Sequence, residues 1–121
     1  MTSVSSHTSA IRAKRVIGTD VSNSAGDKIG QVEDLVLDKL SNHIMFAIVS
    51  FGGFLGMGQK YHPIPWSSLE FDTEEGSYIV DFTKEQLKAA PCDTIDELTR
   101  NDGLSYRDQV YDYYRAPRYW E

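Results

Sequence analysis

The amino-acid sequence predicts an all-β fold, a small barrel of about six strands that is followed by short C-terminal helices and an aromatic tail. Between Val16 and Phe82, short runs of β-forming residues are separated by closely spaced turn residues, a pattern typical of a sandwich or barrel. Helix-capping patterns follow Phe82. With 121 residues, 40% of them hydrophobic, the chain has the size of a single-core domain. Closure into a barrel would protect the strand edges.

The N-terminal part is predicted to be an arm that leads into a first hairpin. Residues 1–14 are rich in Ser and Thr and show no sustained period, so we interpret them as flexible. A first strand is expected over residues 16–21, and turn-forming residues at 23–27 lead into a second strand over 28–38. In this second strand the apolar residues break strict alternation near Gly30, which predicts a β-bulge there.

The remaining strands are expected to differ in burial. Residues 44–51 are apolar on both alternating faces, which predicts the most buried strand. Residues 60–65 contain two prolines, which remove backbone donors and place this segment at a sheet edge or bend. After a turn at 66–69, a last hairpin is expected, with its strands at 70–72 and 78–82.

Two short helices are expected beyond the strands. Thr83 with Gln86, and Thr94 with Glu97, have the spacing of a capping box, in which the two side chains bond reciprocally to backbone amides. Residues 101–103, Asn-Asp-Gly, should end the second helix. Both helices are predicted to cover the barrel.

The tail, residues 105–121, holds five of the seven tyrosines and one of the two tryptophans. Four residues at i, i+4, i+7 and i+8 would share one face of a helix that ends before Pro117. That face either packs on the protein's own barrel or a twin subunit, or it inserts Tyr and Trp anchors into a partner's groove. The tail residues assigned to this interaction are Tyr106, Val110, Tyr113, Tyr114 and Trp120.

Charge and composition narrow the classes of partner and compartment. The net charge is −6, and the 12 basic residues are scattered, which argues against direct binding of nucleic acid. No run of about 18 apolar residues and no apolar signal core is present, so we expect neither a membrane span nor export. Cys92 is the only cysteine, which suits a reducing compartment. A cytoplasmic location is therefore expected.

Four segments of the chain have a family pattern: IGTDV at 17–21, NSAGDKIGQVEDLVLD at 23–38, AIVSFGGFLGMGQKYHPIPW at 47–66 and DFTKEQLKAAP at 81–91. Through these segments, residues 17–91 resemble the PRC-barrel family, whose barrel is shared by the photosynthetic reaction centre H subunit and a ribosome maturation factor. The resemblance implies a compact barrel that is homodimeric in some members, acts in docking or assembly, and has no established catalytic centre. It divides the chain into an arm (1–14), a barrel domain (15–92) and a helical, aromatic extension (93–121).

The sequence offers no grouping of residues that predicts catalysis, a metal or a cofactor. The histidines His7, His43 and His62 lack the spacing that presents two metal ligands together. The glycine-rich segment 52–58 is not followed by the Gly-Lys-Ser/Thr of a phosphate-binding loop. Acidic pairs such as Glu33-Asp34 and Glu74-Glu75 are interpreted as surface charge.

Apolar residues at two other places are candidates for interaction. Phe54, Leu55 and Met57 either fold onto the barrel core or form a dimer or partner contact, because an exposed apolar loop costs solubility unless it is covered. Trp66 either fills the barrel mouth or stacks on a ligand. We therefore predict a non-enzymatic bacterial interaction or assembly module that forms a homodimer and binds an unidentified protein. The alternative is a small-ligand or sensory barrel with a pocket between the barrel and the tail.

Overall fold

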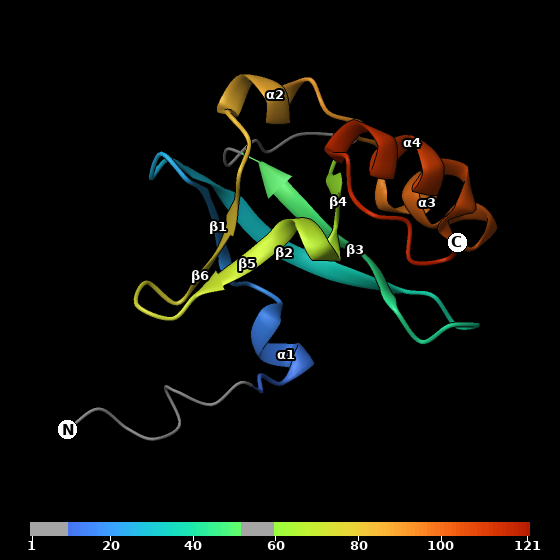
Figure 1. Cartoon of the computed structure of the whole chain (residues 1–121), viewed down its shortest axis with the longest axis horizontal. Coiled ribbons are helices and arrows are strands. Elements are labelled where there is room, and N and C mark those ends of the chain that lie inside the picture. Colours follow the sequence, from blue (N-terminus) through green and yellow to red (C-terminus); the bar gives the residue numbers. More distant parts are fainter. Residues whose placement is uncertain (1–9, 52–59) are drawn as a thin grey trace.

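The computed structural model describes residues 10–51 and 60–121, and it arranges six strands in one curled sheet with the C-terminal helices along one side (Figure 1). The order along the sheet is β4-β3-β2-β1-β6-β5. The six-stranded barrel-like fold predicted from the sequence is confirmed. The strands are β1 (Asp20–Asn23), β2 (Lys28–Leu37), β3 (Ile44–Phe51), β4 (His62–Pro65), β5 (Leu69–Asp72) and β6 (Ser77–Val80).

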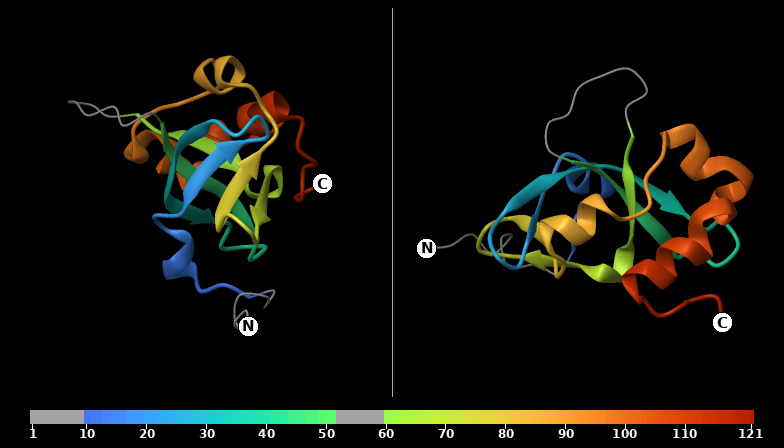
Figure 2. Two further views of the ribbon diagram at one scale, coloured as in Figure 1. Left: turned by 90° about the vertical axis from the view of Figure 1, so that its left-hand side faces the viewer. Right: turned by 90° about the horizontal axis from the view of Figure 1, so that it is seen from above.

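The pairing of the strands curls the sheet on itself. Neighbouring strands are antiparallel except for β1 and β6, which are parallel. The two end strands, β4 and β5, follow each other in the chain through a short 3-10 helix, η2 (Trp66–Ser68). This helix forms the turn that the sequence predicts at 66–69, and it brings the chain from one end of the sheet to the other (Figure 2).

Three β-bulges bend the central strands, one between β1 and β2 and two between β2 and β3. Val21 is opposite Gly30 and Ser22 is opposite Lys28, so Ile29 has no counterpart, and the bulge predicted near Gly30 is confirmed. On the other side of β2, Val36 pairs with Phe46 and Leu37 pairs with Ile44. Met45 is therefore an extra residue in β3. Such insertions increase the local twist, which a small barrel requires.

The core is centred on β3. Residues 45–49 are each at most 1% exposed, which confirms this segment as the most buried strand. The strand β4 lies at the end of the sheet, as its prolines Pro63 and Pro65 predicted. Placing Pro at an edge avoids the loss of ladder hydrogen bonds on both sides.

The helices after β6 begin where capping residues predict them. Thr83 and Gln86 form a complete capping box, and Thr94 accepts a hydrogen bond from the Glu97 amide. Asn101 and Asp102 take left-handed backbone angles, which end the second helix as expected. The helical elements are α2 (Lys84–Lys88), α3 (Ile95–Thr99), the 3-10 helix η3 (Arg100–Gly103) and α4 (Leu104–Tyr114).

The prediction of a first strand from Val16 was wrong. Residues Ala13–Val16 form a helical turn, α1, and the strand begins at Asp20. The carbonyl of Arg12 accepts hydrogen bonds from the amides of Arg15 and Val16, which closes this turn. Val16 is 3% exposed and joins the core. Val16 is β-branched and therefore suited to a strand, but here it lies in a helical turn and packs into the core. Tertiary packing outweighs local propensity at this position.

Candidate interaction site

The predicted interaction residues fall into two described regions. Phe54, Leu55 and Met57 lie outside the described residues. Trp66 lies in η2, and the other five lie in the tail. After α4 the chain turns back and ends beside the β2–β3 hairpin (Figure 2).

The tail helix packs on the barrel of its own chain. Val110 is 0% exposed and Tyr114 is 4% exposed, and both belong to the central core. The ring of Tyr114 meets Phe82 edge-on at 5.0 Å. Burial also raises the pKa of the Tyr114 hydroxyl above its usual range. Two of the residues assigned to interaction are therefore part of the domain core.

Tyr106 and Tyr113 lie at the border of this contact and tie α4 to earlier segments. The Tyr106 hydroxyl donates to Asp93, and this bond raises the pKa of Tyr106 to about 12 and lowers that of Asp93. Asp93 in turn pairs with Tyr61 through the backbone. The Tyr113 hydroxyl donates to the carbonyl of Gln86 in the middle of α2. Both hydroxyls thus contribute to fastening the helix.

Tyr111 was not among the tail residues assigned to interaction, but it contacts both the barrel and the end of the tail. Its side chain is 2% exposed, and its hydroxyl donates to the Met45 carbonyl at 2.7 Å. Met45 is the bulge residue of β3 and has no counterpart in β2. The Tyr111 hydroxyl therefore donates to a carbonyl at a position where the backbone pairing of β2 and β3 is interrupted. The i, i+3 spacing of Tyr111 and Tyr114 was the signal that could have identified this face.

The end of the tail fastens the tip of the β2–β3 hairpin, residues 38–43, hereafter the hairpin tip. The Tyr119 hydroxyl donates to the Asp38 carboxylate at 2.7 Å, and this bond lowers the pKa of Asp38. The Tyr119 ring stacks on His43 with centroids 4.5 Å apart. Lys39 lies 3.9 Å from Asp102 in η3. Contacts on both sides therefore hold the hairpin tip in place.

Trp120 completes this arrangement. Its ring meets Tyr111 edge-on at 4.8 Å, and the guanidinium of Arg107 lies 3.9 Å from its centroid. A cation over an indole ring is attracted by the ring's negative face. Trp120 therefore closes the tail over Tyr111 and remains half-buried.

Trp66 lies apart from these contacts in an aromatic group on the barrel. Its ring is tilted against Tyr78 at 5.4 Å, and Tyr78 meets Phe71 edge-on at 5.1 Å. Tyr78 is buried, Trp66 is half-buried and Phe71 is 43% exposed. The group leads from the core to the surface at β5.

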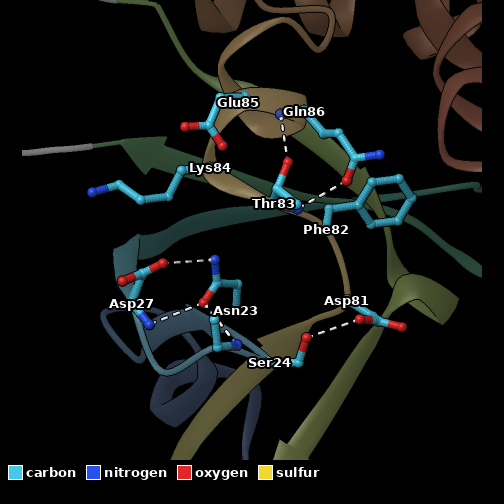
Figure 3. Close-up of a pocket in the computed structure, with 10 residues that line it drawn as sticks. Asn23, Ser24, Asp27, Asp81, Phe82, Thr83, Lys84, Glu85 and Gln86 are labelled. Carbon is cyan, nitrogen blue, oxygen red and sulfur yellow. Dashed lines mark hydrogen bonds between the residues drawn. The ribbon is translucent and has the colours of Figure 1, made fainter.

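Two shallow hollows lie on the barrel, and neither is lined by a tail residue. The first, of about 390 Å³, lies between the β1–β2 turn and the start of α2, where the Ser24 hydroxyl donates to Asp81 at 2.8 Å (Figure 3). The second, of about 420 Å³, lies on the outer face of β1, β6 and β5. Neither hollow is the pocket between barrel and tail that the ligand-binding alternative requires.

Within residues 10–51 and 60–121, no group of three or more His, Cys, Asp or Glu side chains could hold a metal ion. Over the same residues, no helix combines the length and apolar character needed to span a membrane. The exposed acidic pairs, Glu33-Asp34 and Glu74-Glu75, lie on the surface as predicted.

His62 is the buried histidine among the described residues. It is 8% exposed, it stacks on Phe51 at 3.8 Å, and neither ring nitrogen has a hydrogen-bond partner among the described residues. Desolvation lowers its pKa from 6.5 to about 4. Burial of an imidazole without a partner disfavours the charged form, so His62 is neutral at neutral pH.

This burial predicts a loss of stability in mild acid. Since the folded pKa of His62 lies below its ordinary 6.5, the unfolded chain takes up the proton first, and stability falls as pH decreases from 6.5 to about 4. The expected loss is about 3 kcal/mol. The variant His62→Phe keeps a ring on Phe51 but has no titrating group. Urea unfolding at several pH values should give a smaller acid loss for this variant. Parallel pH profiles of the two proteins would contradict the assignment.

Comparison with known proteins gives a family and a distant structural similarity. A family model described as the PRC-barrel domain matches residues 9–87. No match was found among curated proteins. Among solved structures, the chain is similar to the 16S ribosomal RNA processing protein RimM of Pseudomonas aeruginosa, with 13% identity and a TM-score of 0.45. The similarity covers 66% of this chain and 48% of that one, so it extends over about half the length of the other protein.

Proposed function

Because the chain belongs to the PRC-barrel family, through a match that extends over residues 9–87, we propose that it is a non-enzymatic protein-interaction or assembly module. The observation that carries the proposal is the hairpin tip, which presents Leu40 with 98% of its surface exposed. A fully exposed apolar side chain on an ordered hairpin offers a surface that a partner can bury with a gain in hydrophobic free energy.

The hairpin tip is ordered before any partner binds. The Asp38 carboxylate accepts from the amides of Leu40 at 3.0 Å and Ser41 at 3.3 Å, and the tail holds Asp38 and His43 from outside. A segment that is already ordered loses less conformational entropy on binding. In this proposal the tail acts as a support, and the hairpin tip makes the contact.

The proposal also includes the contacts and context inferred from the sequence. Phe54, Leu55 and Met57 are proposed to contribute a second contact, together with the exposed parts of Tyr106 and Trp120. The proposed assembly includes a homodimer, in a bacterial cytoplasm. Sedimentation of the purified chain beside a Phe54→Ser, Leu55→Ser variant tests this part. Dimers that persist in the folded variant would remove these loop residues from the interface.

The variant Leu40→Ser tests the proposed contact of the hairpin tip. Because the Leu40 side chain is almost fully exposed, the variant should keep its stability. Its affinity for the partner should fall at least tenfold. The full chain and the variant are used to capture proteins from a lysate of the source organism, and the captured protein is then purified and titrated. Ile17→Ser, a similar change at a residue 39% exposed, is the matched control. Equal affinity of both variants would rule out the hairpin tip as the contact.

A further inference from the structure

We infer that the outer edge of β5 binds an extended segment of another protein in which basic and apolar residues alternate. This surface is separate from the hairpin tip, so the inference goes beyond the proposed function. Three observations support this inference: the backbone edge of β5 is open, the two faces of β5 differ in chemistry, and the surrounding residues are acidic.

The strand β5 ends the sheet and is open on one side. It pairs with β6 through four residue pairs, from Leu69 with Val80 to Asp72 with Ser77. Among the described residues, no other strand or isolated bridge pairs with β5. Figure 2 (right) shows β5, in yellow, along one border of the molecule with no element beyond it. An edge of this kind offers backbone donors and acceptors to an incoming strand.

The two faces of β5 differ in chemistry because side chains alternate along a strand. Leu69 and Phe71 share the face that carries the buried cross-strand partners Val80 and Tyr78. On this face Phe71 is 43% exposed at the edge, where it continues the aromatic group of Tyr78 and Trp66. An apolar side chain of an incoming strand would cover it.

The opposite face of β5 is acidic. Glu70 lies across from Ile79, and the hollow of about 420 Å³ on this side is lined by Asp72, Glu75 and Ile79 among others. A Lys or Arg side chain can lay its apolar stem on Ile79 and bring its charge to the carboxylates. Because successive residues of the incoming strand face opposite sides, the preferred sequence alternates between basic and apolar.

The charge of the surrounding chain selects the same partner. Residues 67–83 contain five acidic side chains and no basic one. Glu70, Glu74 and Glu75 are exposed, and no ion pair holds any of them in the described structure. A second copy of this edge would bring like charges together, and like charges opposite each other destabilise a strand pair. The occupant is therefore a basic segment of a different protein.

The test uses a short synthetic peptide of alternating Lys and Val, labelled for fluorescence anisotropy. The full chain should bind it with a dissociation constant of about 10–100 μM, as suits a four-residue edge, and backbone amide shifts should centre on residues 69–72. Glu70→Lys should weaken binding by about tenfold. Asp96→Lys, an equal change of charge at an exposed site on α3, should leave binding unchanged.

Two further peptides separate strand pairing from general attraction. One has the same composition in a blocked order, and the other carries N-methyl groups on alternate backbone nitrogens, which prevents pairing along one edge. Equal binding of either peptide, or no binding of the alternating peptide at millimolar concentration, would overturn the inference. Amide shifts at 69–72 that depend on protein concentration alone would assign the edge to a second copy. None of these results alters the Leu40→Ser test, so failure here leaves the proposed function standing.

Discussion

Replacing Gly30 with alanine is expected to cost at least about 3 kcal/mol of the free energy of unfolding. A Cβ atom at this position would lie 1.6 Å from the Ser50 carbonyl oxygen and 3.2 Å from the Phe51 Cα. Both atoms belong to the backbone of β3, so no rotamer change relieves the clash. Gly30 also pairs with Val21 on its other side, and the added atom would have to push β3 away from a strand held on both edges.

Urea unfolding monitored by circular dichroism measures this effect. Gly76→Asn is the matched control, because Gly76 has a φ of 69° and open space at the Cβ position, and Asn tolerates that conformation. The control should lie within about 1 kcal/mol of the wild type. A Gly30→Ala protein as stable as this control would show that β2 and β3 can separate locally without loss, which contradicts the close approach.

The two glycines also show where sequence-based prediction succeeded. The broken alternation at Gly30 and the turn chemistry before Ser77 are local signals, and both the bulge and the last hairpin were predicted from them. The contact of Gly30 with Ser50 joins residues that are distant in the chain. It depends on how strongly β2 bends over β3, and local residue patterns do not encode that distance.

The parallel pairing of β1 with β6 was not predicted for the same reason. Val21 lies opposite Tyr78 although more than fifty positions separate them in the chain. Sequence patterns identify hairpins, whose strands are joined by short turns, but give little information on which distant strands meet. Only the complete sheet brings β1 and β6 together.

The tail was predicted correctly as a helix and only in part as a surface. Its aromatic content indicated that it covers something, and Val110 and Tyr114 do face the core. The buried Tyr111 was missed because its value to the fold depends on an unpaired position in β3, at Met45. The loop residues Phe54, Leu55 and Met57 stay a prediction, and Leu40 had no sequence signal beyond its place in a turn.

Replacing Tyr111 with alanine is expected to cost about 3–5 kcal/mol, the range for truncating a large buried aromatic side chain. The centroid of the Tyr111 ring lies 6.2 Å from that of Phe46 and 4.8 Å from that of Trp120. This packing would be lost together with the hydrogen bond to the Met45 carbonyl. Because Tyr119 and Trp120 close over Tyr111, the variant should also release the tail from the hairpin tip. Hydrogen exchange in residues 38–43 should accelerate accordingly.

The conservative variant Tyr111→Phe separates the ring from the hydroxyl. It keeps the aromatic packing and leaves the buried Met45 carbonyl without its donor, so a loss of about 1–2 kcal/mol is expected, with little change in exchange at the hairpin tip. If Tyr111→Ala cost no more than Tyr111→Phe, the ring would contribute nothing to the fold. The tail would then be an attached segment of the barrel, free to bind elsewhere. A large difference between the two variants makes the tail a structural part of the domain, and the hairpin tip that it supports depends on it.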